Sequence, residues 1–129
     1  MEVSVKKVIS TNGAPSAIGP YSQGIDTGSL VFVAGQIGRE AQSGDLAEGV
    51  EGQTEQAMKN IAAILDAAGL SWADVVKTTC FLADIADFDA FNGVYKTFVV
   101  DPAPARSTFA VKDLPRGARV EVEAIAARG

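Results

Sequence analysis

Hydrophobic and polar residues alternate in short segments along the first third of the chain, a pattern that predicts strands. Residues 3–9 and 22–25 fit short strands, and residues 30–34 fit a mostly buried strand that ends at Gly35. Residues 11–21 are rich in turn formers and predict a loop. The missing Cβ of Gly35 would let a ligand or another part of the backbone approach closely.

The hydrophobic period becomes helical between residues 50 and 68, and again after Asp84, which is a suitable helix N-cap. Gly69 fits the left-handed residue that often ends a helix. Two prolines, Pro102 and Pro104, are expected to close the second helix. The predicted buried faces consist of Ala57, Ile61, Ile64, Leu65 and Ala68 in the first helix and of Phe91, Val94, Tyr95 and Phe98 in the second.

Three further strands are predicted, at residues 75–82, 106–112 and 118–126. The first follows a short turn with capping-box spacing at residues 71–74, and the last two are joined by a turn at residues 114–117. The element order is then β, β, β, α, β, α, β, β. We therefore expect one α+β domain over residues 1–129, a mixed sheet with two helices packed on one face.

Composition supports a folded single domain and excludes several functions. The chain has 129 residues, 47% of them hydrophobic, and a formal net charge of −5. This acidic balance argues against nucleic acid and anionic membranes as partners, which require basic patches. No apolar run is long enough for a membrane span, the N-terminus lacks a signal-peptide core, and the single cysteine, Cys80, cannot form an internal disulfide. These features predict a cytoplasmic protein.

The absence of histidine narrows the possible chemistry further. It removes Ser-His and Cys-His nucleophile pairs, histidine acid–base catalysis and HExxH metal sites, and one cysteine is too few for a thiolate zinc site. We therefore expect no metal site. Any catalysis must use carboxylates, arginine, lysine, tyrosine, backbone groups and water.

Arg106 stands at the start of a predicted strand, where a charge requires a partner carboxylate or a ligand that carries one. In the last strand, alternation separates Glu121 and Glu123 from the small apolar residues between them. If the last two strands pair as a hairpin, Arg106 comes level with these glutamates, and the register decides whether they share a face. Alternatively, Arg106 is a structural ion-pair partner or an edge-strand charge, and the glutamates are solvated, which is the preferred interpretation for Glu123.

Seven motifs, in order along most of the chain, resemble the RidA (YjgF) family of enamine/imine deaminases. Each is weak alone, but the ordered set is specific. The motifs are AIGPYSQG (17–24), VAGQIG (33–38), ILDAAGL (64–70), VVKTTCFLADIADF (75–88), FNGVY (91–95), PARS (104–107) and VEVEAIA (120–126).

The resemblance implies a chorismate-mutase-like α+β protomer that forms a homotrimer with its sites in the clefts between subunits. The implied activity is hydrolysis of reactive 2-imino acids and their enamine tautomers to 2-keto acids and ammonium. The substrates of this class are 2-aminoacrylate/2-iminopropanoate and 2-iminobutanoate. The resemblance implies that the reaction requires no cofactor.

The resemblance also implies roles for single residues. Arg106 matches the arginine that holds the substrate carboxylate, and Glu121 matches the glutamate that positions the attacking water. The other matching positions are Tyr21 and Asn92, which would line the cleft, Gly35, a backbone contact point, and Thr108, which stands where a cysteine is frequent in the family.

Simpler interpretations remain for several of these residues. Tyr21 could pack a loop or a subunit contact, and Asn92 could lie on the polar face of its helix. Cys80, within a strand of valine, threonine and phenylalanine, is expected to be a small buried residue and not a nucleophile. Two other functions remain open: a non-catalytic module that binds small carboxylates or 2-keto acids, and an endoribonuclease or translation inhibitor.

Overall fold

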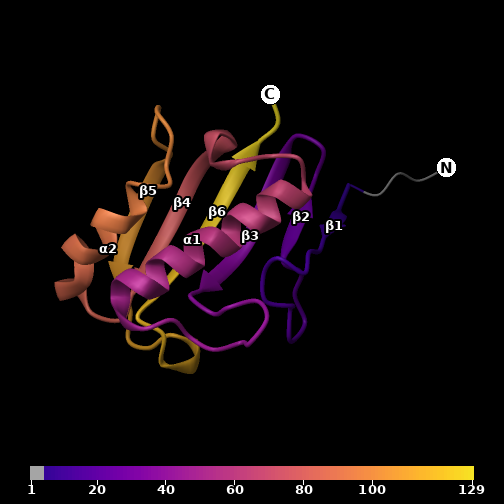
Figure 1. Cartoon of the computed structure of the whole chain (residues 1–129). Helices are drawn as coiled ribbons and strands as arrows, with labels where there is room; N and C mark the ends of the chain where they lie inside the picture. The colour runs from indigo at the N-terminus through magenta and orange to yellow at the C-terminus, as the bar shows by residue number, and fades with distance from the viewer. Residues whose placement is uncertain (1–4) are drawn as a thin grey trace.

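The helices and strands follow the predicted order in a computed structural model of the chain, which describes residues 5–129 (Figure 1). The α+β class is confirmed. The strands are β1 (Lys7–Ile9), β2 (Gly24–Asp26), β3 (Leu30–Ile37), β4 (Val75–Leu82), β5 (Ala105–Ala110) and β6 (Val120–Ala127). The α-helices are α1 (Gly49–Ala67) and α2 (Phe88–Tyr95), and three short 3-10 helices are η1 (Trp72–Asp74), η2 (Ile85–Asp87) and η3 (Pro115–Gly117).

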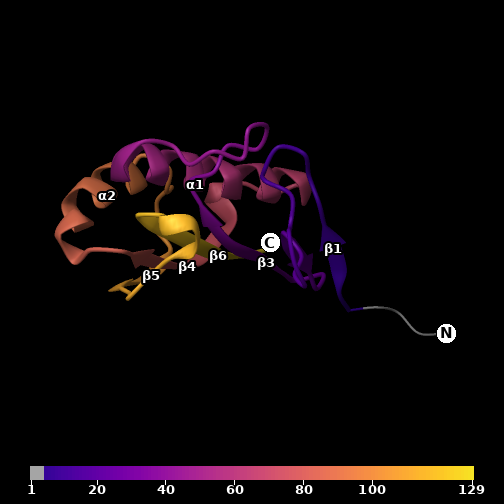
Figure 2. The same cartoon turned by 90° about the horizontal axis from the view of Figure 1, so that it is seen from below.

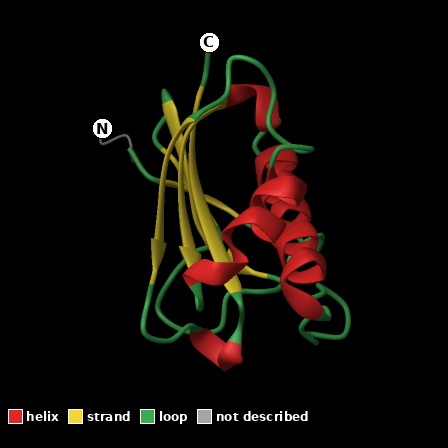
Figure 3. Cartoon of the chain, turned by 90° about the vertical axis from the view of Figure 1, so that its left-hand side faces the viewer, coloured by secondary structure: helices red, strands yellow, loops and turns green. Residues whose placement is uncertain are grey.

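The six strands form one mixed sheet in the order β1-β2-β3-β6-β4-β5. All neighbouring strands are antiparallel except β4 and β5, which are parallel. The two α-helices lie against the same face of this sheet (Figures 2 and 3). The predicted mixed sheet with both helices on one face is therefore confirmed.

The predicted hairpin between the last two strands is wrong, because β4 lies between β5 and β6. β5 follows β4 through α2, and a strand–helix–strand connection of this kind joins parallel strands. The chain then passes η3 and inserts β6 between β3 and β4, antiparallel to both. Arg106 is consequently opposite Thr78 of β4 and not beside the glutamates of β6.

Two boundaries in the first third of the chain also differ from the prediction. β3 does not end at Gly35 but continues to Ile37, through a register shift between Val33 and Gln36 against β6. Such an irregularity allows a strand to continue past a residue that leaves the regular ladder. The predicted strand at residues 3–9 shortens to β1, and its first two residues lie outside the described part of the chain.

The second helix is shorter than predicted. Asp84 caps η2, and α2 begins after it and ends at Tyr95, well before the two prolines. Phe91 and Tyr95 are buried as expected, whereas Val94 and Phe98 are only partly buried. The main contacts of α2 with the core therefore come from two aromatic residues.

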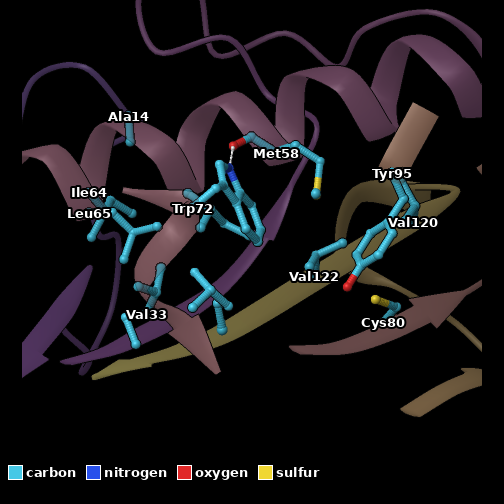
Figure 4. Packing of buried hydrophobic residues seen from close by; sticks show 14 of the residues in the cluster. Ala14, Val33, Met58, Ile64, Leu65, Trp72, Cys80, Tyr95, Val120 and Val122 are labelled. Atoms are coloured by element: carbon cyan, nitrogen blue, oxygen red, sulfur yellow. Dashed lines mark hydrogen bonds between the residues drawn. The ribbon is translucent and has the colours of Figure 1, made fainter. Parts of the chain in front are cut away.

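The hydrophobic core lies between α1 and the sheet (Figure 4). The predicted face of α1 is buried except for Ala68, which follows the helix and is only partly buried. Gly69 comes next with φ of +77°, as predicted. The indole Nε1 of Trp72 donates a hydrogen bond of 3.3 Å to the Met58 carbonyl, which ties η1 to the helix. On β6, alternate small residues face this core. No helix in residues 5–129 is long and apolar enough to cross a membrane.

We expect Ile64→Ala to lower the free energy of unfolding by about 2–5 kcal/mol, because the side chain is 0% exposed in the core. Ile85→Ala is the matched control, since that side chain is 57% exposed and its truncation should change stability by less than about 1 kcal/mol. Both values follow from chemical denaturation. Equal losses for the two variants would contradict this description of the core.

Candidate functional site

Arg106 lies on β5, on the face of the sheet that the helices cover. Its Nη1 donates a hydrogen bond of 2.7 Å to Oδ1 of Asn92 in α2. The guanidinium carbon lies 4.7 Å from the ring centre of Tyr95, with the rings of Phe88 and Phe91 at 5.6 and 6.0 Å. Within residues 5–129 it forms no ion pair with a carboxylate. An amide and aromatic faces hold this charge, so donors remain for an anionic ligand.

The ring beneath the guanidinium is itself fixed by a hydrogen bond. The Tyr95 hydroxyl and Oγ1 of Thr78 are 2.7 Å apart in the interior. Burial raises the pKa of the Tyr95 phenol, which keeps it protonated at neutral pH. Tyr95 is therefore a rigid, neutral support for Arg106.

Thr108 lies two residues beyond Arg106 and on the same face of β5. Its Oγ1 is buried and has no hydrogen-bond partner in the described part of the chain. A buried hydroxyl without a partner is unfavourable by about 1–3 kcal/mol, so this group is available to a ligand.

Cys80 of β4 is opposite Thr108 and is fully buried. Burial raises the pKa of its thiol to about 11, so the group is a neutral thiol at physiological pH. The prediction of a small buried residue in place of a nucleophile is therefore confirmed.

Glu121 of β6 lies on the opposite face of the sheet from Arg106. The flanking residues Val120 and Val122 are 0% exposed beneath the helices, so alternation directs Glu121 to the other face. Its side chain makes no hydrogen bond or ion pair among the described residues. Burial raises the pKa of this carboxyl, and the nearby Glu123 raises it further. A carboxylate with a raised pKa is a stronger proton acceptor than an ordinary one.

Gly35 provides the space that the Glu121 side chain occupies. A Cβ built at position 35 would collide with the Glu121 carboxylate, which lies against β3 at this point. The sequence predicted a close approach at Gly35, and the group that approaches in this structure is a side chain of β6.

Tyr21, Gly35 and Glu121 line one cleft with a volume of about 530 Å³. Tyr21 comes from the loop before β2 and is 53% exposed. Two arginines that the sequence analysis did not single out, Arg39 and Arg116, line the same cleft. The turn residues around them predict loops, but they do not reveal the direction in which an arginine side chain points.

The predicted site residues thus form two groups on opposite faces of the sheet. The first group is Arg106, Asn92 and Thr108, and the second is Tyr21, Gly35 and Glu121. One copy of the chain does not bring Arg106 and Glu121 together. Among the described residues, no cluster of histidine, cysteine, aspartate and glutamate could hold a metal ion.

We expect Gly35→Ala to destabilise the protein by at most about 1 kcal/mol, because the added methyl group collides with the Glu121 carboxylate, the mobile end of a side chain that can move into the cleft. The φ of Gly35 is not in the left-handed region, so without the collision alanine would be neutral or slightly stabilising. The double variant Gly35→Ala/Glu121→Ala tests this cause. In chemical denaturation, the loss caused by Gly35→Ala should largely disappear in the Glu121→Ala background; an unchanged loss would refute the contact.

Known proteins are similar to this chain over nearly their whole length. The chain is 48% identical to a protein of Mus musculus named 2-iminobutanoate/2-iminopropanoate deaminase, over 100% of this chain and 96% of that protein. The crystal structure of E. coli TdcF with bound serine is 44% identical, with a TM-score of 0.92, and covers 96% of this chain and 100% of that one.

A second solved structure and a family model agree with these relatives. The YjgF gene product of E. coli is 41% identical, with a TM-score of 0.91, over 95% of this chain and 99% of that chain. The family model described as Endoribonuclease L-PSP matches residues 11–128. The chain therefore belongs to the Endoribonuclease L-PSP family, the family of the RidA and YjgF proteins that its motifs resemble.

Proposed function

We propose that this protein is an imine deaminase that hydrolyses 2-imino acids, such as 2-iminopropanoate and 2-iminobutanoate, to 2-keto acids and ammonium. The observation that carries this proposal is the guanidinium of Arg106, which is fixed by Asn92 and aromatic rings and has no carboxylate partner within residues 5–129. The name of the Mus musculus relative supports the same activity. The single buried cysteine fits a reducing compartment such as the cytoplasm.

The residue types suit the reaction. A guanidinium binds the planar carboxylate of a 2-imino acid through two parallel charge-assisted hydrogen bonds. This fixes the C=N carbon at one point, so that attack by a bound water becomes a positioned step. The water oxygen bonds to that carbon while the Glu121 carboxylate accepts a proton and passes it to nitrogen. The carbinolamine hydroxyl then gives its proton to Glu121 and through it to the nitrogen, as the C=O bond forms and the C–N bond breaks. The 2-keto acid and ammonia leave, and ammonia takes up a proton from the solvent to become ammonium.

We further propose that the site is completed between two copies in a homotrimer, because Arg106 and Glu121 lie on opposite faces of one protomer. Arg106, Asn92 and Thr108 would come from one copy, and the cleft of Tyr21, Gly35 and Glu121 from the next. A closed ring would repeat this site three times. The face opposite the helices supports such contacts, since Phe32 and Phe109 are 41% and 52% exposed.

The two other functions have less support. A binding module would need Arg106 but not a carboxylate of raised pKa in a cleft. The name of the family model mentions an endoribonuclease. The chain, however, has a net charge of −5 and no histidine for acid–base cleavage of RNA.

Arg106→Ala and Glu121→Gln should each lower the rate of imine hydrolysis at least about a hundredfold. The first removes the guanidinium that binds the substrate carboxylate, and the second removes the carboxylate that accepts the proton. The imine is generated with a threonine dehydratase and trapped as its semicarbazone. Arg128→Ala is the matched control, since this arginine pairs with Asp26 and follows β6 at the end opposite to Glu121. If adding the wild-type protein left the yield of semicarbazone unchanged, the proposed deaminase activity would be refuted.

The same two variants test the shared site. If they are unfolded together, refolded as mixed trimers and assayed, about a quarter of the sites should combine an intact Arg106 with an intact Glu121. Activity should therefore return to about a quarter of the wild-type level. If the mixed trimers, confirmed as trimers by light scattering, were as inactive as each variant alone, a site built from two copies would be contradicted.

Glu121→Gln should also raise thermal stability at neutral pH. The pKa of Glu121 is raised in the folded state, so ionising this carboxyl destabilises the fold. This effect is absent below the ordinary glutamate pKa and complete above the raised value. The gain in Tm over the wild type should thus be present at pH 7 and vanish near pH 4. If the Tm of Glu121→Gln at pH 7 were lower than that of the wild type, the ionised Glu121 would be stabilising the fold, which contradicts this expectation.

A further inference from the structure

The arginines of this chain differ in whether an acid neutralises them. Two of the five, Arg119 and Arg128, form ion pairs of 2.8 and 2.6 Å with aspartates. Arg39, Arg106 and Arg116 form none within residues 5–129, although acidic residues outnumber basic ones by sixteen to eleven. Arg106 has its role in the proposed function. The other two line the cleft that contains Glu121.

Arg39 is held at this cleft by its own contacts. Its Nε donates a hydrogen bond of 3.0 Å to the Gly44 carbonyl, and its backbone carbonyl accepts one of 2.8 Å from Asn60. Asn60 is 0% exposed on α1, so this anchor belongs to the core. Among residues 5–129, no acid forms an ion pair with Arg39, so its terminal nitrogens remain available as donors.

Arg116 is held at the same cleft in an unfavourable backbone conformation. Its φ is +59°, and it is the one residue other than glycine with a positive φ among residues 5–129. Glycine is the residue that this conformation favours, and a side chain there costs about 1 kcal/mol. Strain of this kind often accompanies a functional position. A guanidinium at a position suited to glycine indicates a use for that guanidinium.

The cleft is also larger than a small neutral substrate requires. Its volume of about 530 Å³ lies within the range of pockets for ligands much larger than a three-carbon imino acid. Glu121 is the single acidic residue that lines it, against two guanidiniums. The rest of the lining is mainly apolar or backbone, so the two arginines provide the charge recognition.

We propose that the cleft selects 2-imino acids whose side chain carries a second carboxylate. This inference rests on the proposed function and deepens it. Arg106 binds the carboxylate next to the imine carbon, and Arg39 and Arg116 bind the carboxylate at the far end. Glu121 lies in the same cleft as the two arginines and steers the water. The reaction is unchanged: water adds across C=N, and the products are a 2-keto dicarboxylic acid and ammonium.

The test compares two imines made in place by amino-acid oxidases, one from glutamate and one from 2-aminobutyrate, both trapped as semicarbazones. The expected kcat/KM is at least about tenfold higher for the acidic imine, because only its second carboxylate forms charge-assisted hydrogen bonds with the two guanidiniums. Arg39→Gln and Arg116→Gln should each lower the acidic-to-neutral ratio about tenfold. Lys112→Gln, an exposed cation in the same β5–β6 connection, should keep the wild-type ratio.

Arg116→Gly separates recognition from backbone strain. Glycine relieves the positive φ, so this variant should be as stable as the wild type or more stable, yet lose the selectivity. A purely structural Arg116 predicts unchanged selectivity. Calorimetry gives a readout without turnover: 2-oxoglutarate should bind at least about tenfold more tightly than 2-oxobutanoate, and this difference should shrink in Arg39→Gln.

The outcomes separate the inference from the function beneath it. Hydrolysis of the neutral imine with a ratio near one, unaffected by the three arginine variants, would overturn the inference and leave the deaminase intact. Hydrolysis of neither imine would overturn both. A high acidic-to-neutral ratio of kcat/KM in the wild type that falls in all three arginine variants would support recognition of a second carboxylate.

Discussion

The alternation of β6 is the constraint on which the rest of the molecule depends. This central strand directs small apolar residues such as Val120 and Val122 into the core beneath α1 and directs Glu121 to the other face. Burial of the apolar set is the dominant favourable term in folding, so the side of the sheet that carries the carboxylate is settled by core formation. A shift of one residue would bury the glutamate. The position of the candidate proton acceptor is thus a consequence of how the core is packed.

Arg106 lies on the other face of the sheet from Glu121. It lies on the edge strand β5 and on the helix side, where α2 places aromatic rings and the amide of Asn92 against it, and no carboxylate among residues 5–129 forms an ion pair with it. A charge that is partly removed from water and lacks a counter-ion is stabilised when an anion arrives. Because the same sheet separates it from Glu121, the two functional groups face away from each other. In the proposed trimer a second copy of the chain would unite them, and the oligomeric state would then be a condition for the chemistry.

Much of this arrangement could be predicted from the sequence, and the part that could not has a physical reason. The helical stripe of α1, the left-handed Gly69 and the alternation of β6 are local patterns, and each was confirmed. The pairing of β5 was wrong, because the order of strands in a sheet depends on long-range contacts that local patterns do not encode. The extension of β3 past Gly35 was missed for a similar reason: the register shift arises only against β6.

The features that local rules would disfavour gather around the candidate site. In the part of the chain that the structure describes, Arg106 has no counter-ion and the Thr108 hydroxyl has no hydrogen-bond partner. The pKa of Glu121 is raised by burial, and Arg116 adopts a positive φ. The core beneath α1 shows no comparable conflict, since its buried residues are apolar or hydrogen-bonded. Sequences usually agree with their structures at every level except where function requires otherwise. Because these groups cluster on two surfaces and not throughout the fold, they mark the two surfaces as candidate parts of a ligand site. An anion would satisfy the arginines, and a bound water would donate a hydrogen bond to Glu121.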